Sequence, residues 1–112
     1  MQGDIIVPFS DLIGETIESF LGLREGSSVV AFVTKSGTDF HLFSPTVPYT
    51  LVHEIRGDFQ EVLGSPLTTA EVGVDDTGVI YTLKTATATL SFRWNEFEGP
   101  DLGVEVQFAI VP

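Results

Sequence analysis

Two histidines are the side chains of this sequence that titrate nearest to neutral pH, and each has a carboxylate beside it. His41 lies two residues after Asp39, and His53 is followed directly by Glu54. Two imidazoles and one carboxylate can bind a divalent transition metal when the fold brings them together. A histidine within a strand is more often a packed or surface residue, so the sequence favours a structural role for both histidines.

A second group of candidate ligands occurs in the stretch NEFEGPD near the C-terminal end. Asn95, Glu96, Glu98 and Asp101 supply the hard oxygen atoms that calcium prefers. Their spacing does not match the calcium loop of an EF-hand. We therefore expect a solvated acidic loop here, and no metal or other cofactor.

Patterns for nucleophilic or phosphate chemistry are missing from the sequence. It has no cysteine, which excludes disulfides, thiolate zinc sites and cysteine nucleophiles. It also has no Gly-x-Ser-x-Gly elbow, phosphate-binding loop or dinucleotide fingerprint. The sequence therefore predicts a protein without enzymatic activity.

The tripeptide Arg56-Gly57-Asp58 matches the motif that cell-adhesion ligands present to their receptors. Such a ligand needs its aspartate to project from a mobile loop. Here the tripeptide is followed at once by a short run with apolar residues at helical spacing, namely Phe59, Val62 and Leu63. The motif therefore looks like the beginning of a helix.

The residues around this run predict where the helix begins and ends. Asp58 is a preferred N-cap residue, and Glu61 three positions later completes an acidic form of the capping box. Gly64 can adopt the left-handed conformation that ends a helix, and Pro66 prevents its continuation. We predict a helix over about Phe59–Leu63 and a structural role for the tripeptide.

Alternation of apolar and polar residues, which is typical of half-buried strands, recurs through the remaining chain. The clearest hairpin joins Val29–Thr34 to Thr38–Phe43 through a turn at Lys35-Ser36-Gly37. Three further strands have apolar faces made of Val79, Tyr81 and Leu83, of Ala88, Leu90, Phe92 and Trp94, and of Val104, Val106, Phe108 and Ile110.

Two segments are less regular. In residues 15–23 we expect a strand with Ile17, Ser19, Leu21 and Leu23 on one face and Phe20 on the other. Residues 50–56 fit either a strand or an extended lead into the helix.

The elements together indicate an α+β fold that is mainly β. About seven short, mostly antiparallel strands would form a sheet or a partly open barrel with one short helix. A length of 112 residues suits one domain, residues 1–112, which can bury a core without disulfides.

Charge limits the classes of partner. Sixteen acidic residues against five Lys and Arg give a net charge of −11, so direct binding to nucleic acid or an anionic membrane is not expected. A basic protein partner fits this charge.

No apolar run approaches the ~20 residues of a membrane helix, and no signal peptide is visible, so we expect a cytoplasmic location. Unpaired edge strands also make a homo-oligomer compatible with the sequence.

Three blocks carry a resemblance to a known family: LIGETI at Leu12–Ile17, GDFQEVLGSPLTTAE at Gly57–Glu71 and LSFRW at Leu90–Trp94. They resemble, in the same order, the signature blocks of a small family of uncharacterised phage and bacterial proteins. That family typically has cysteines before the Gly-Asp block, whereas residues 41–54 here have none. The resemblance implies a phage-related protein, and it implies no activity.

These observations favour an acidic protein-interaction module, such as an inhibitor or accessory protein that docks to a basic partner. The expected binding residues are Glu96, Glu98, Asp101 and Glu105, because carboxylates can mimic phosphates in a basic groove. The alternative is a small-molecule-binding protein with a pocket between sheet and helix. Its expected lining is Phe40, Phe43, Tyr49 and Trp94.

Overall fold

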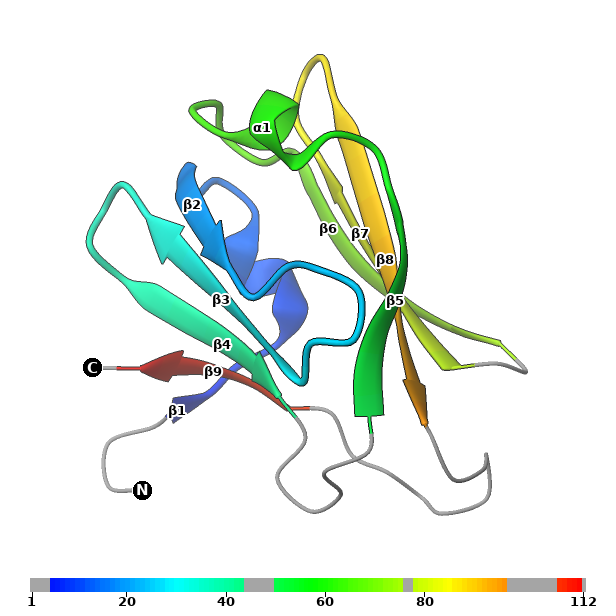
Figure 1. The fold of residues 1–112 in the computed structure, drawn as a ribbon. Coiled ribbons are helices and arrows are strands. Elements are labelled where there is room, and N and C mark those ends of the chain that lie inside the picture. The colour runs from blue at the N-terminus through cyan, green and yellow to red at the C-terminus, as the bar shows by residue number, and fades with distance from the viewer. Residues whose placement is uncertain (1–4, 44–49, 76–77, 97–106, 112) are drawn as a thin grey trace.

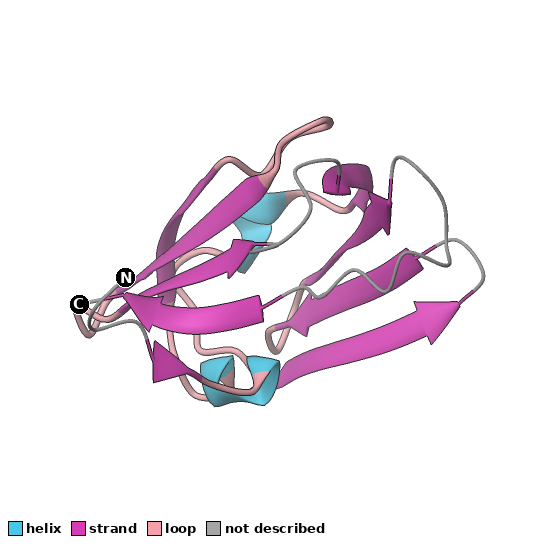
Figure 2. Ribbon diagram, turned by 90° about the horizontal axis from the view of Figure 1, so that it is seen from below, coloured by secondary structure: helices cyan, strands magenta, loops and turns pink. Residues whose placement is uncertain are grey.

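Two antiparallel sheets dominate the computed structural model, which describes residues 5–43, 50–75, 78–96 and 107–111 (Figure 1). Strands make up most of this part, as the colouring in Figure 2 shows. The strands are β1 Ile5–Ile6, β2 Ile17–Leu21, β3 Val29–Thr34, β4 Asp39–Phe43, β5 Thr50–Arg56, β6 Thr69–Asp75, β7 Gly78–Lys84, β8 Thr89–Glu96 and β9 Gln107–Val111. The helical segments are the 3-10 helix η1, Phe9–Leu12, and the α-helix α1, Phe59–Val62.

The five-stranded sheet has the order β1-β9-β4-β3-β2, and the four-stranded sheet has the order β5-β8-β7-β6. Every pairing between these strands is antiparallel. Figure 1 shows the two sheets beside each other with α1 at their upper end. The predicted mainly β, antiparallel fold with one short α-helix is confirmed, and its strands form two sheets without closing a barrel. Within the described ranges, no helix has the length and apolar character needed to cross a membrane.

The predicted hairpin is confirmed, and its first strand has the predicted bounds. Its second strand begins at Asp39, one residue later than expected. Thr38 instead closes the turn, because its carbonyl oxygen accepts hydrogen bonds from the backbone N–H (3.3 Å) and the Oγ1 hydroxyl (2.6 Å) of Thr34. The segment 50–56, which the sequence left open, is the strand β5.

The predicted faces of residues 15–23 are right for the buried Ile17 and Leu23 and wrong for Phe20 and Leu21. The register between β2 and β3 shifts between Ile17 and Ser19. A bulge of this kind adds a residue to one strand and reverses the alternation beyond it. Ile17 is therefore buried as expected, but Phe20 packs against the core and Leu21 is 59% exposed.

The core lies between the sheets and is rich in aromatic side chains. Phe9 of η1 makes edge-to-face contacts with Phe32, Tyr81 and Phe108, with ring centroids 4.9–6.0 Å apart. Such pairs contribute roughly 0.5–1.5 kcal/mol each beyond the burial of their surface. η1 thereby ties β3, β7 and β9 together at the centre of the molecule.

Alternation predicted the core-facing side chains of β7 and β8 well. The buried side chains are Tyr81, Leu83, Leu90, Phe92 and Trp94, and Val79 and Ala88 at the ends of the rows are half-buried. In the last strand Phe108 is buried and Ile110 half-buried as expected, while Val104 and Val106 lie outside the described residues.

Candidate functional site

The acidic residues expected to bind a partner belong mostly to the undescribed part of the chain. Glu98, Asp101 and Glu105 lie outside the described residues. Glu96 is placed by its backbone alone, at the end of β8, where it pairs with Thr50 of β5. The prediction that these four acidic residues bind a partner therefore rests on the sequence alone.

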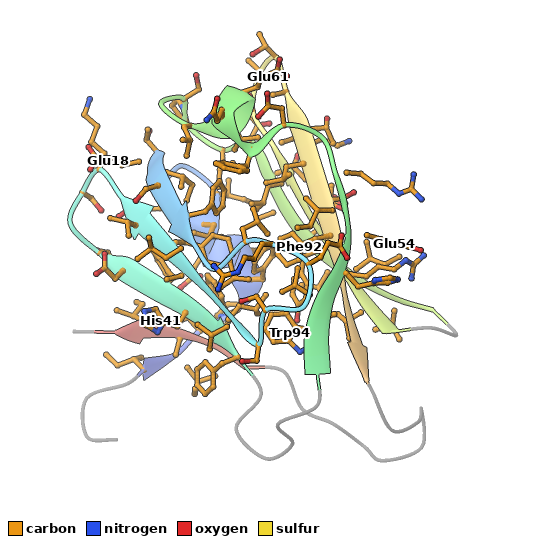
Figure 3. All side chains as sticks on the ribbon, in the orientation of Figure 1. Glu18, His41, Glu54, Glu61, Phe92 and Trp94 are labelled. Atoms are coloured by element: carbon orange, nitrogen blue, oxygen red, sulfur yellow. The ribbon has the colours of Figure 1, made fainter. Side chains whose placement is uncertain are left out.

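Of the four aromatic residues of the alternative pocket, the structure describes Phe40, Phe43 and Trp94. Phe40 is 2% exposed and stacks on Phe108, with ring centroids 5.1 Å apart. Phe43 is half-buried at the end of β4, opposite Val29, and Tyr49 lies outside the described residues. The fourth, Trp94, is 1% exposed, as expected for a core residue, and lies between the two sheets (Figure 3).

One polar atom of the core has no visible partner. Trp94 belongs to a row of apolar side chains across the four-stranded sheet, between Val52 of β5 and Val79 of β7. Its indole Nε1 is buried without a hydrogen-bond partner in the described part of the chain. A buried donor left unsatisfied costs about 1–3 kcal/mol. This atom is therefore a position where an acceptor would be stabilising.

The two histidines lie in different sheets and do not form a joint site. His41 is half-buried in β4, while His53 and its neighbour Glu54 are exposed on β5. Figure 3 shows His41 and Glu54 at opposite sides of the molecule. In residues 5–43, 50–75, 78–96 and 107–111, no three His, Asp or Glu side chains are grouped in a way that could hold a metal ion.

A charged cluster brings together side chains that the sequence keeps far apart: Glu25, His53, Glu54 and Arg93. The Arg93 Nε donates to Glu54 Oε1 at 2.7 Å. His53 places Nδ1 at 3.4 Å from Glu25 Oε1 and Nε2 at 3.7 Å from Glu54 Oε2. The sequence does not predict that Arg93 pairs with Glu54, because it does not show the register of β5 and β8.

Irregular backbone creates this cluster. The register between β5 and β8 shifts between His53 and Arg56, and Glu54 within the shift has φ +52°. A non-glycine residue in this left-handed region is uncommon. The loop before β3 is held against β5, since Gly26 N–H donates to Val52 O and Ile55 N–H donates to Glu25 Oε2.

The charged cluster has the character of a solvated surface network. The side chains of His53, Glu25 and Glu54 are 48%, 61% and 41% exposed. Exposed ion pairs contribute roughly 0–1 kcal/mol each. The cluster therefore fixes the loop to β5 without creating a water-excluded catalytic centre.

Among the described residues, Tyr81 is the titratable group whose environment clearly shifts its pKa. Burial in the core raises the pKa of Tyr81 far above its ordinary value. The phenol therefore stays neutral well into the alkaline range, and it belongs to the apolar core rather than to a reactive site.

The predicted N-cap at Asp58 is confirmed, whereas no hydrogen bond from the Glu61 side chain completes the predicted capping box within the described chain. The Oδ1 atom of Asp58 accepts a hydrogen bond from the N–H of Gln60 at 2.9 Å, and Glu61 donates its N–H to the Asp58 carbonyl oxygen. The carboxylate of Asp58 is therefore directed at its own helix. α1 ends at Val62, one residue before the predicted end, and Gly64 has the expected positive φ of +85°.

Acidic side chains also outnumber basic ones on the described surface. The exposed acids are Asp11, Glu18, Glu25, Glu54, Asp58, Glu61 and Glu71, and the exposed bases are Arg24, Lys35, Arg56 and Lys84. These features define a small, acidic protein of two antiparallel sheets. Comparison of the chain with family models, with curated proteins and with solved structures gave no match.

Proposed function

We propose that this chain is a non-enzymatic interaction protein that docks to a basic protein partner. The observation that carries the proposal is the charge: sixteen acids against five Lys and Arg, for a net charge of −11. Such an excess steers a cationic surface toward the protein and speeds association at low ionic strength.

The acidic stretch near the C-terminal end is the proposed contact. Glu96, Glu98, Asp101 and Glu105 place four carboxylates within ten residues, with one cation nearby at Arg93. Carboxylates at this density can replace phosphates in a basic groove of a nucleic-acid-binding protein. The resemblance to phage and bacterial proteins supports an inhibitor or accessory protein, phage-encoded and acting in the cytoplasm of its host.

Capture of partners from a bacterial lysate over a series of salt concentrations tests this function. We expect basic proteins to be retained at low salt and released as salt screens the charges. The variant Glu96→Gln, Glu98→Gln, Asp101→Asn, Glu105→Gln should lose them. Its control neutralises four other acids that lie outside the proposed contacts, Asp11→Asn, Glu15→Gln, Glu18→Gln and Glu61→Gln. Absence of any basic partner at low salt would refute the function, and equal loss in both variants would refute the assigned residues.

A small-molecule-binding protein is the second candidate, and it is favoured by the Nε1 of Trp94, which has no hydrogen-bond partner among the described residues. A ligand with an acceptor atom beside this donor would recover the lost hydrogen bond. Native mass spectrometry of freshly purified protein tests this candidate, because a retained ligand adds its own mass. Protein at the mass of the bare chain, with no change in Trp94 fluorescence on addition of cell metabolites, would refute it.

A further inference from the structure

Strand β6 forms one outer edge of the four-stranded sheet. Just before β6, the backbone of Leu67 is hydrogen-bonded to another segment of the chain. Its N–H donates to Glu15 O, and its carbonyl oxygen accepts from Gly14 N–H. From Thr69 to Asp75 the described chain pairs with β7 on one side and places no strand on the other. The helix η1 packs against β6, but residues 71–74 are all exposed, so this half of the outer edge is open to a further strand.

The other sheet edges of the described chain are short, bulged or covered. β1 has two residues, and β2 carries a bulge and accepts a hydrogen bond at Ile17 O from Gly64 N–H. β5 is also bulged, and Val52 exchanges backbone hydrogen bonds with Gly26 and Ser27. These are the devices by which proteins prevent unwanted pairing at an edge.

β6 is neither short nor bulged, and its second half is not covered by the described chain. Its register with β7 runs without a shift from Thr69↔Lys84 to Asp75↔Gly78. Its sequence, TAEVGVD, contains no proline, lysine or arginine. A regular, uncharged or acidic edge of seven residues is long enough to accept another strand.

The side chains of β6 indicate what such a strand would carry. Val72 and Val74 continue the core-facing row of Ala70, but they are 49% and 79% exposed while Ala70 is 4% exposed. Glu71 is exposed on the opposite face. A strand added here would meet apolar side chains on one face and a carboxylate on the other.

We infer that the edge of β6 binds an extended segment of the basic partner, in which apolar and basic residues alternate. This inference rests on the proposed function and adds a second contact to it. The apolar residues pack beside Val72 and Val74, and the basic residues lie next to Glu71. A second copy of this chain fits the edge less well, because both copies carry a charge of −11 and acidic edges.

The test uses synthetic peptides as long as β6, one with alternating Lys and Val and one with alternating Glu and Val. Isothermal titration calorimetry gives the affinity, and amide chemical shifts locate the site. The variant Val72→Lys, Val74→Lys places two cations on the edge. Its matched control is Ile5→Lys, Ile6→Lys, which removes two comparably exposed apolar residues from the other sheet and adds the same charge.

We expect the Lys-Val peptide to bind the unchanged chain and to shift the amides of β6, and the Glu-Val peptide not to bind. The Val72, Val74 variant should weaken binding by about tenfold, and the control by less than about twofold. Equal weakening in both variants, or shifts that avoid β6, would overturn the inference. So would a dimer of the unchanged chain in sedimentation that the Val72, Val74 variant abolishes.

Failure of the inference and failure of the proposed function give different results. If the Val72, Val74 variant captures the same basic proteins from lysate as the unchanged chain, the function stands and the site on β6 is refuted. If no basic protein is captured but the Lys-Val peptide binds β6, the edge is a strand acceptor and the proposed function is refuted.

Discussion

Replacement of Gly57 by alanine is the sharpest test of the tertiary structure. Gly57 has φ +99°, and a Cβ added there would overlap the main-chain carbonyl oxygen of Thr89 and lie 3.3 Å from the Cα of Leu90. Gly64 has a similar φ of +85°, but a Cβ added there meets nothing within 4 Å. The two glycines thus share the backbone conformation and differ in their surroundings.

The expected magnitudes follow from these two terms. The left-handed conformation costs an alanine about 1–2 kcal/mol at either site. At Gly57 the overlap with β8 backbone adds about 1–3 kcal/mol, because main chain in a sheet cannot move aside as a flexible side chain does. Gly57→Ala should therefore lower the free energy of unfolding by about 2–5 kcal/mol, and Gly64→Ala by about 1–2 kcal/mol.

Urea denaturation followed by the fluorescence of Trp94, the single tryptophan, measures both variants. Circular dichroism confirms that each variant is folded before the titration. If the two variants lose the same stability within about 0.5 kcal/mol, Gly57 does not approach β8 in solution. The close approach of Gly57, just before α1, to the backbone of β8 would then be wrong.

Three further predictions concern single side chains. Asp58→Ala should lower the free energy of unfolding by about 1 kcal/mol, as measured by urea denaturation, because it removes the cap on Gln60 N–H. Burial raises the pKa of Tyr81 above the ordinary 10.0, so the contribution of Tyr81 to stability should be constant below that pH and fall above it, where the unfolded chain loses its proton first. Tyr81→Phe should flatten this fall in urea midpoints measured across the alkaline range. The emission of Trp94 should be blue-shifted in the folded protein, because this residue is 1% exposed, and should move to longer wavelength in urea.

An unchanged midpoint for Asp58→Ala would contradict the cap. A stability that is flat through the alkaline range in the unchanged chain would contradict the burial of Tyr81. Emission at the wavelength of free tryptophan in the folded protein would contradict the position of Trp94 in the core.

The sequence by itself determined the features whose causes are local. The cap at Asp58 and the positive φ of Gly64 involve hydrogen bonds and backbone preferences within a few residues. The core faces of β7 and β8 follow from strict alternation, which needs no knowledge of the neighbouring strand. The helix and the mainly β, antiparallel fold were therefore predictable.

The tertiary structure alone decided the features that depend on register and strand order. The bulge in β2 arises in its pairing with β3, so Phe20 rather than Leu21 faces the core. Arg93 reaches Glu54 because β5 lies beside β8, although the two residues are 39 positions apart. The open edge of β6 likewise exists because β6 is last in its sheet. Alternation specifies which residues share a face of a strand, but the partner of a strand is set by packing of the whole chain, which no local pattern encodes.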